Sequence, residues 1–463
     1  MRLTNARRAD GPRGSRRLWK TCLYGAATAL LAPAPLAVAP EALAQPAPEA
    51  APPNPEDVLG NIVVVAGATR SLPKIGILPS LASELEDVTL RSVVRRDLDL
   101  CGEFEVLPDS AAPEGLYLSD SPIDVRAWAQ KGVEAVVKVN AKPLPGGGRA
   151  ELRGLAYFVN RGTTPVFDKR FEVDGARVRE ESHRLADVII GALTGKNGSF
   201  ASHMTFASGN GKVRRVYTMD ADGHGAKAAS PVEQMAISPA FGKDEQLYYA
   251  ASIGDEGFKV RTATGGPFNL PIKGSVYGIA FSKDRSQLAL SIGIGSTVKV
   301  FTGPDFAGVK PASDVGMALQ PTFTPSGKLA FVGEGKYGQR VFVEGKPISP
   351  DGLMASAPTF CDHPDGVRAV FAVGIGKNTD LVATGEQGGQ LGRLTQNQGR
   401  NGYPACSPDG RLVAFFSTRT GNEGPGLYIM RVDGGRPKRV STLLGDSLRW
   451  EPLPQSRPSS SPQ

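Results

Sequence analysis

The chain has 463 residues, of which 40% are apolar and 21% are charged. A chain of this length can bury a sizeable core and is expected to form two domains. Its 56 glycines and 37 prolines are more than a helical protein usually carries, and they are typical of a β protein rich in turns.

The formal net charge of +7 arises mainly at the N-terminus, where residues 1–44 contain seven basic and two acidic side chains. The rest of the chain has 46 basic and 44 acidic residues and is therefore close to neutral. This balance argues against a protein that binds the phosphate backbone of nucleic acids, because that function needs a strongly basic surface.

Residues 1–44 have the pattern of a cleavable export signal. A basic stretch precedes a short apolar run, and the small residues ALA at 42–44 suit a signal peptidase. Pro33 and Pro35 interrupt the apolar run, which is shorter than the roughly 20 residues that a membrane span needs. We predict export with cleavage after Ala44. The segment SRRLWK matches a twin-arginine signal only in part, so the export route is left open.

Two segments separate the export signal from the second half of the chain. Residues 45–60 are a Pro/Ala-rich arm, too poor in large apolar side chains to fold alone. Residues 61–200 alternate between strand and helix patterns and predict a small α/β domain. Its expected strands are KIGILP, EAVVKVNA and a hairpin of AELRGLAYFVN with PVFDKRFEV.

Apolar spacing predicts three helices in this N-terminal domain. One lies at 87–100 and stops before Gly102, and another lies at 177–193 and stops before Gly195. A shorter helix is expected to open at Ser121-Pro122 and to carry Trp128.

The second half of the chain, residues 201–455, repeats one pattern without any helical periodicity. A short strand ends in SPDG at 407–410, and an alternating strand follows. Proline, aspartate and glycine in that order favour a tight turn between two strands. Weaker copies precede it at steps of 44, 42, 39 and 44 residues, and the residues in the position of Ser407 are Ser238, Ser282, Thr324 and His363. A period of this length with four short strands predicts the blades of a β-propeller.

The ends of this region predict how the propeller closes. SLRWEP at 447–452 reads as an innermost strand that has nothing after it, whereas HMTFAS at 203–208 lacks an innermost strand before it. Joined, they complete a sixth blade, and such a closure leaves no open edge. The fold class predicted is thus an α+β N-terminal domain followed by an all-β six-bladed propeller, with residues 456–463 as a disordered tail.

Once Cys22 is removed with the signal, Cys101, Cys361 and Cys406 remain. Three thiols allow at most one bridge. We expect all three to be buried small side chains without a disulfide.

Several of the segments quoted above resemble the family of the periplasmic Tol-Pal protein TolB. The stretch SHRLADVIIGALTGKNGSFASHMTFAS is similar to that family's junction into its propeller, and RWEP at 449–452 is similar to its closing motif. RRDLDLCGEFEVL and AWAQKGVEAVVKV occur in the order of its N-terminal domain, which is of an anticodon-binding-like type. The chain departs from the family in its long proline-rich arm and in having Cys406 where a tryptophan is common, so we expect looser packing there.

The resemblance implies a protein-binding adaptor in the periplasm of a Gram-negative bacterium, and neither an enzyme nor a cofactor is expected. A Pal-like peptidoglycan-associated lipoprotein would dock at the propeller mouth, and a TolA-like inner-membrane protein would bind the N-terminal segment. The link would support envelope integrity and cell division.

The loops that lead into the innermost strands converge on one mouth and are the predicted partner-binding face. They lie at 233–235, 275–278, 317–320, 355–357, 400–403 and 446–449. Tyrosine and arginine are the residue types that dominate protein interfaces. The predicted contact residues are Ser275, Val276, Tyr277, Gly278, Leu319, Gln320, Arg400, Asn401, Tyr403 and Arg449.

Three other signals are interpreted as structural. GEGKYG at 333–338 spells a dinucleotide fingerprint, but no helix is expected after it, so a hairpin is predicted. DADG at 220–223 lacks the later glutamate of a calcium loop and is predicted to be a turn. The four histidines are scattered without ligand spacing, and no metal site is predicted.

Two other classes of function stay open beside the adaptor. A propeller hydrolase or lactonase would hold a metal in the central channel, and a third class would bind peptidoglycan or another carbohydrate. A propeller peptidase would need a further domain of roughly 200 residues, which is not expected in this chain.

Overall fold

The computed structural model describes residues 71–452 except 116, 118–120, 244–245 and 422, together with residues 54, 57–58 and 63–64. The predicted signal at 1–44, most of the arm at 45–60 and the tail at 456–463 lie outside the described residues. No helix in the described ranges is long and apolar enough to cross a bilayer.

The first part of the described chain is a five-stranded sheet in the order β3-β2-β4-β5-β6. Strand β2 is parallel to β3 and β4, whereas β4, β5 and β6 are antiparallel to one another. The predicted hairpin at 150–173 is confirmed as β5 and β6. The strands are β2 (Lys74–Ile77), β3 (Glu105–Val106), β4 (Ala135–Pro143), β5 (Arg149–Phe158) and β6 (Phe167–Asp174).

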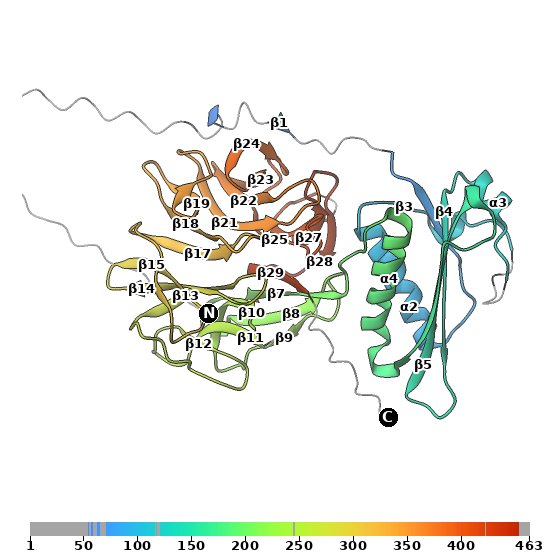
Figure 1. The fold of residues 1–463 in the computed structure, drawn as a ribbon, viewed down its shortest axis with the longest axis horizontal. Coiled ribbons are helices and arrows are strands. Elements are labelled where there is room, and N and C mark those ends of the chain that lie inside the picture. The colour runs from blue at the N-terminus through green and yellow to red at the C-terminus, as the bar shows by residue number, and fades with distance from the viewer. Residues whose placement is uncertain are drawn as a thin grey trace, which may run out of the picture. The chain divides into compact units, whose positions relative to one another are not determined.

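Two long helices, α2 (Leu85–Leu100) and α4 (Val178–Thr194), lie side by side against this sheet (Figure 1). Their predicted apolar stripes are buried in one core with the strands, and both helices are confirmed. Helix α4 ends at Gly195, whose φ of 83° is one that glycine adopts without steric cost.

The short helix α3 (Val125–Gln130) covers the other face of the sheet. The carboxylate of Asp124 accepts a hydrogen bond from the backbone N–H of Ala127. The helix therefore begins later than the predicted start at Ser121-Pro122. Its Trp128 packs directly over Gly76 of β2, where a side chain would clash with the indole ring. Short 3₁₀ turns occur at Asp109–Ala111, Val159–Arg161, Gly175–Arg177 and Gly211–Val213.

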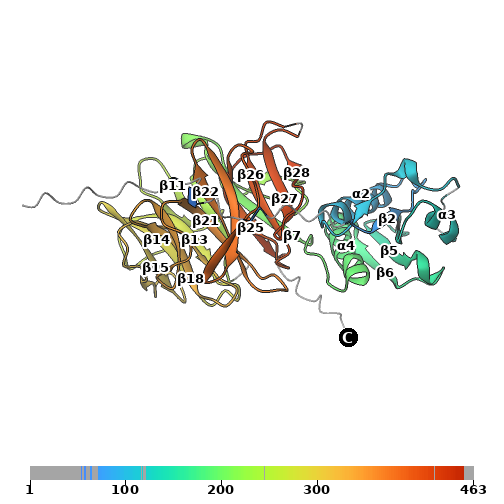
Figure 2. The same ribbon diagram turned by 90° about the horizontal axis from the view of Figure 1, so that it is seen from above.

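The second part of the described chain contains six β-sheets arranged as the blades of a propeller (Figures 1 and 2). Each blade runs from an innermost strand at the channel to an outermost strand, and neighbouring strands of the blade are antiparallel. Several of the outermost strands begin with a lysine, which discourages edge-to-edge pairing with another molecule.

The blades are made of the following strands. The blade that closes the ring contains β29 (Asp446–Pro452), β7 (Ser202–Ser208), β8 (Arg215–Asp220) and β9 (Lys227–Ala228). The next two contain β10 (Met235–Phe241), β11 (Leu247–Ser252) and β12 (Lys259–Arg261), then β13 (Ser275–Phe281), β14 (Leu288–Ile294), β15 (Thr297–Gly303) and β16 (Lys310–Pro311).

The other three blades follow in chain order. The first contains β17 (Ala318–Phe323), β18 (Leu329–Glu334), β19 (Gln339–Val343) and β20 (Lys346–Pro347). The second contains β21 (Met354–Cys361), β22 (Arg368–Ile375), β23 (Asn378–Gly385) and β24 (Gly388–Arg393), with the short β1 (Val63–Val64) paired to β24. The last contains β25 (Asn401–Cys406), β26 (Leu412–Ser417), β27 (Gly426–Arg431) and β28 (Lys438–Ser441).

The predicted closure between the two ends of the propeller is confirmed. Strand β29 pairs with β7 in an antiparallel register that sets Trp450 opposite Met204. The indole N–H of the buried Trp450 donates to the hydroxyl of Ser202 at 2.8 Å.

The repeated turn is confirmed at Ser282, Thr324, His363 and Ser407. In each case the carbonyl of that residue accepts an N–H from three residues later, as in a tight turn. The assignment of Ser238 to this turn is wrong, because Ser238 lies inside β10. The turn of that blade comes later, where the N–H of Gly242 donates to the carbonyl of Gln246. Proline follows serine both at Ser238, inside a strand, and at Ser407, in the turn, so the dipeptide alone cannot distinguish the two positions.

Cys361 and Cys406 form a disulfide with their Cα atoms 5.1 Å apart. The prediction of three unpaired thiols is therefore wrong for this pair, and Cys101 is the free, buried cysteine. Each bonded cysteine is the last paired residue of an innermost strand, in β21 and in β25. Neighbouring blades bring these two positions together. A disulfide therefore joins the blades at Cys406, where the sequence predicted looser packing.

Loss of this disulfide should lower the stability of the propeller. In Cys361→Ser we expect a decrease of about 2–4 kcal/mol, because the bridge closes a loop between residues 45 apart in the chain. Calorimetry with and without a thiol reductant measures the effect. The reductant should lower the melting temperature of the wild type and leave Cys361→Ser unchanged; an equal response of both proteins would contradict the prediction.

Candidate partner-binding site

One face of the propeller, here called the mouth face, is defined by strand direction. Each innermost strand starts at this face, and the second strand of each blade runs back to it. The segments that lead into innermost strands and the loops between second and third strands therefore share the mouth face. The partner-binding face predicted from the sequence includes only the segments that lead into innermost strands.

A bulge interrupts the pairing of every innermost strand near its start. Five of the bulge residues have positive φ values of 50–53°, although none of them is glycine. Such backbone strain is uncommon and tends to occur where function requires it. The six residues, called the bulge ring below, are Ser238, Tyr277, Gln320, Ala357, Tyr403 and Ser447.

The bulge ring surrounds a cavity of about 220 Å³ at the centre of the mouth face. Polar contacts join neighbouring blades around it. The hydroxyl of Ser238 donates to the carbonyl of Tyr277 at 2.7 Å, and the N–H of Ala357 donates to the side-chain oxygen of Gln320 at 2.6 Å. Burial raises the pKa of Tyr403, so this phenol stays neutral at physiological pH. The ring is thus a rigid, uncharged rim.

The structure brings part of the predicted contact set to this cavity. Its walls include Tyr277, Gln320 and Tyr403 of the ring together with three neighbours, Gly278, Leu319 and Arg449. Ser275 instead lines a separate groove that it shares with Tyr277 and several glycines.

Three other predicted contact residues do not line the cavity. Val276 and Asn401 are fully buried, so the prediction that their side chains can contact a partner is corrected. The amide of Asn401 joins two blades, because it donates to the carbonyl of Thr379 in β23 of the preceding blade. Arg400 is exposed, and its guanidinium lies near the carbonyl of Lys377.

The sequence placed Ala357 and Ser447 in the predicted mouth loops but indicated neither as a contact residue, and Ser238 was assigned to a turn. A usable signal was present, because proline follows the ring residue in four innermost strands, as in Gln320-Pro321 and Tyr403-Pro404. Aligning the repeats on that dipeptide would have separated the bulges from the turns.

The large apolar side chains that are exposed on the described part of the propeller all lie on the mouth face. Met317 and Met354 stand at the starts of innermost strands, and Ile294 ends a second strand. A concentration of exposed apolar side chains on one face marks an interaction surface. The set is Val213, Val232, Ile253, Tyr277, Ile294, Met317, Met354, Leu443 and Leu444.

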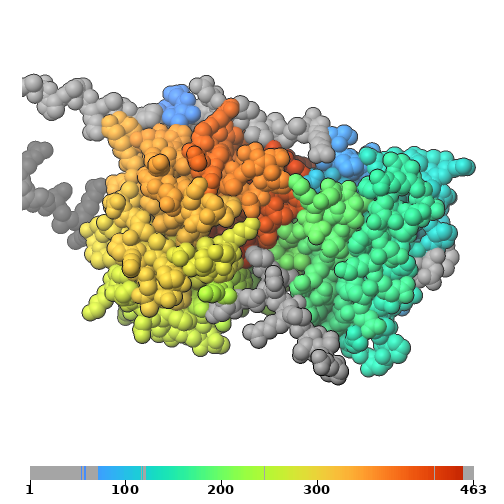
Figure 3. Space-filling model, in the orientation of Figure 1, coloured from blue at the N-terminus to red at the C-terminus, as the bar shows by residue number. Residues whose placement is uncertain are grey.

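The N-terminal domain contacts the opposite end of the blades. Arg96 of α2 donates to the carbonyl of Asp222, in the turn that follows the third strand of the closing blade. Arg411 and Arg431 form ion pairs with Glu103, and both lie where strands reach that end. Figure 3 shows the green surface near α4 adjoining the orange and red surface of the last blades. The mouth face is therefore not occupied by these contacts.

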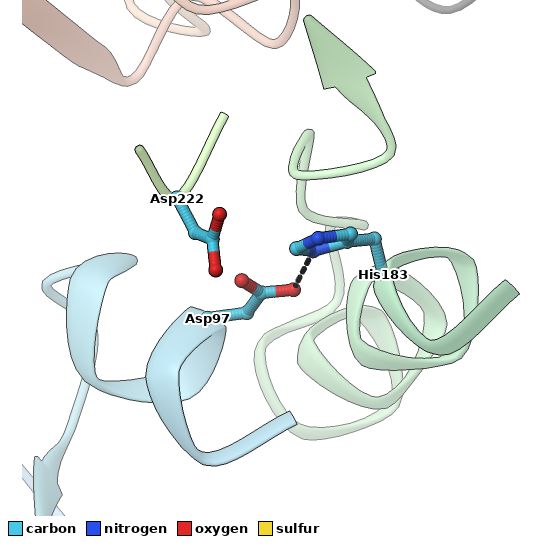
Figure 4. A group of neighbouring side chains, drawn as sticks. All are labelled: Asp97, His183 and Asp222. Carbon is cyan, nitrogen blue, oxygen red and sulfur yellow. Dashed lines mark hydrogen bonds and ion pairs between the residues drawn. The ribbon is translucent and has the colours of Figure 1, made fainter. Parts of the chain in front are cut away.

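Asp97, His183 and Asp222 form a buried cluster in this joint, with ligand atoms within 4.8 Å of one another (Figure 4). The Nδ1 atom of His183 lies 2.6 Å from a carboxylate oxygen of Asp97. The cluster also contains two arginines, since Arg179 bonds Asp222 at 2.6 Å and Arg96 lies 3.5 Å from it. These guanidiniums already neutralise Asp222, and His183 pairs with Asp97, so the cluster fits an ion-paired joint better than a cation site.

Burial sets unusual proton affinities in this joint. Burial raises the pKa of Asp97 to about 6, although His183 opposes the shift. Burial also raises the pKa of Asp187 to about 7, while the N–H groups of Phe200 and Ala201 that it accepts oppose this. For His183 burial alone would lower the pKa, but the carboxylate of Asp97 outweighs it and raises the pKa.

The fold and the mouth define a class of protein: a two-domain β-propeller with an apolar face suited to binding another protein. Residues 60–162 match the family model of the TolB amino-terminal domain. Over 184 residues the chain is 32% identical to the Tol-Pal system protein TolB of Thiobacillus denitrificans, covering 40% of this chain and 42% of the relative. Over 266 residues it is 27% identical to a TolB homologue of Chlorobium chlorochromatii, covering 56% and 58%.

The crystal structure of TolB from Acinetobacter baumannii has a similar fold, with a TM-score of 0.66 and 19% sequence identity. The match covers 82% of this chain and 97% of that chain. The resemblance drawn from the sequence is thus confirmed: residues 60–162 match the TolB amino-terminal domain, and the fold is similar to that of a solved TolB structure. The chain spans about two-fifths of the length of the first curated relatives, at 42% and 43%.

The raised pKa values of Asp97 and Asp187 predict that stability falls as the pH rises. The folded-state pKa values of Asp97 and Asp187 lie above the unfolded value, so their contribution is largest at acidic pH. The free energy of unfolding should fall as the pH rises from about 5 to about 7, by at most about 1.4 kcal/mol per pH unit for each group. Denaturant titrations at several pH values measure this slope.

The variant Asp187→Asn should reduce the slope, because its side chain cannot titrate. Asp168→Asn is the matched control, since the hydrogen bond from Arg153 lowers the pKa of Asp168 and that group stays ionised throughout this range. A slope that is equal in the wild type and in Asp187→Asn would refute the assignment.

Proposed function

We propose that the protein is a non-enzymatic adaptor of the Tol-Pal system in the periplasm. Its mouth face binds a Pal-like peptidoglycan-associated lipoprotein, and its N-terminal segment binds a TolA-like inner-membrane protein. The resulting link across the envelope would support outer-membrane integrity and cell division. The match of residues 60–162 to the TolB amino-terminal domain and the names of the curated Tol-Pal relatives support this assignment.

The observation that carries the proposal is the gathering of exposed apolar side chains on the mouth face. Residues such as Tyr277, Met317 and Met354 lose water-exposed apolar area when a protein covers them, and this favours association. They surround a rim held by backbone pairing, so little conformational entropy is lost on binding. An adaptor needs such a prepared surface and no reaction centre.

The proposed contact with a TolA-like protein involves the segment after the predicted cleavage site. Most of that segment lies outside the described residues. Its described portion includes Val63–Val64, which pairs in parallel with Gly392 and Arg393 at the outer edge of a blade. The proline-rich composition of residues 45–60 suits an extended arm that reaches a partner.

Two alternatives compete with the adaptor. A lactonase of the propeller type would need a divalent cation in the channel, but the guanidinium of Arg449 lies there and repels cations. Stoichiometric metal in the purified protein would support the enzyme. A cell-wall binder would sediment with purified peptidoglycan whether or not the lipoprotein is added.

The double variant Tyr277→Ser/Met317→Ser should weaken binding of the soluble domain of the Pal-like lipoprotein by about ten-fold or more, because two apolar contacts are removed. Isothermal titration calorimetry measures the affinity. Leu85→Ser is the control, since Leu85 is also exposed but belongs to the N-terminal domain. An affinity that stays the same in the double variant would contradict the proposal that the mouth face binds the lipoprotein.

A further inference from the structure

Arg449 is placed by β29 in the central channel of the propeller. One guanidinium nitrogen lies 3.2 Å from the carbonyl oxygen of Pro321 and 3.5 Å from that of Ile279, on two other blades. Arg449 lines both the mouth cavity and a second cavity of about 180 Å³ on the opposite side. Its side chain therefore divides the channel and faces space on each side.

The charge of Arg449 has no carboxylate within ion-pair distance among the described residues. Two other enclosed arginines of the propeller are paired with carboxylates, Arg393 with Asp380 and Arg285 with Glu451. Two carbonyl groups offset only part of the cost of removing a guanidinium from water. Burial accordingly lowers the pKa of Arg449, and the charge of Glu451 opposes the shift only in part.

The cavity on the mouth side has walls that suit a small apolar body. Leu319, Pro321, Pro358 and Pro404 contribute apolar surface around it. The acidic group in this wall, Asp446, is already paired with Arg214. The cavity thus offers one unpaired positive charge inside an enclosure that is otherwise neutral and partly apolar.

We propose that the channel contains an anion-binding site centred on Arg449 and that it takes a carboxylate carried on a short apolar group. The planar guanidinium matches a carboxylate through parallel N–H donors. A single unpaired charge suits a monoanion, whereas a phosphate dianion would also approach Asp446 and Glu451. The carboxylate comes either from a free small acid or from a side chain or C-terminus of a protein docked at the mouth.

Butyrate is a probe of this chemistry, tested on the full protein at constant ionic strength with chloride as the reference anion. Wild type should bind butyrate saturably, seen as a concentration-dependent rise in melting temperature and by saturation-transfer NMR. Arg449→Gln should bind at least about ten-fold more weakly, which corresponds to 1.4 kcal/mol. Arg436→Gln, at an exposed arginine outside both channel cavities, should bind like the wild type.

If butyrate does not bind saturably to the wild type, the proposed anion-binding site is wrong, and no variant is needed to show this. If Arg449→Gln binds butyrate as tightly as the wild type, Arg449 is not the centre of the site. If inorganic phosphate binds more tightly than butyrate, the proposal that the site takes a carboxylate is wrong. Should Arg449→Gln fail to fold, Arg449→Lys keeps the charge but loses the parallel donors, and weaker butyrate binding by it supports the same site.

A second experiment distinguishes a free small acid from a carboxylate of the docked protein, and it rests on the proposed function. Competition between butyrate and the soluble lipoprotein domain supports a carboxylate of the docked protein as occupant. Binding of both together supports a free acid as occupant. If the lipoprotein does not bind at all, the proposed function fails while the butyrate measurement still decides the channel site.

Discussion

The backbone pairing of β29 with β7 is the constraint on which the rest of the propeller depends. It joins strands that lie at the two ends of the repeat region, so the ring of blades has no free inner edge. Trp450 anchors the pairing by filling the core and by donating to Ser202. The same junction is tied to α4, because Asp187 accepts the N–H groups of the two residues that lead into β7. Closure of the ring and attachment of the N-terminal domain are therefore one structural unit.

Closure also places the charge in the channel. Successive residues of a strand point to opposite sides, so the indole of Trp450 enters the core while the neighbouring Arg449 enters the channel. A slip of one residue in the pairing would exchange them and bury the guanidinium in the core. The propeller therefore sets the position of its channel arginine through backbone hydrogen bonds and side-chain packing together.

The two ends of the propeller differ in the side chains that they present. The end that contacts the N-terminal domain uses ion pairs such as Arg179 with Asp220 and Asp222, which hold a permanent joint by charge. The mouth face presents exposed apolar side chains around a neutral rim. Five residues of the bulge ring have strained backbone, which directs their side chains toward the cavity walls rather than adding stability. The joint with the N-terminal domain leaves that face free.

The sequence by itself determined the class of fold, the helices α2 and α4, the repeating turns and the closure at Trp450, because these follow from local spacing and turn chemistry. It also indicated which loops reach the mouth. Only the tertiary structure decided that Cys361 bonds Cys406, that Val276 and Asn401 are buried, and that Ser238 belongs to a bulge. These properties depend on which blades are neighbours and on the exact strand register, and local sequence patterns contain neither, because both arise when distant segments pack together.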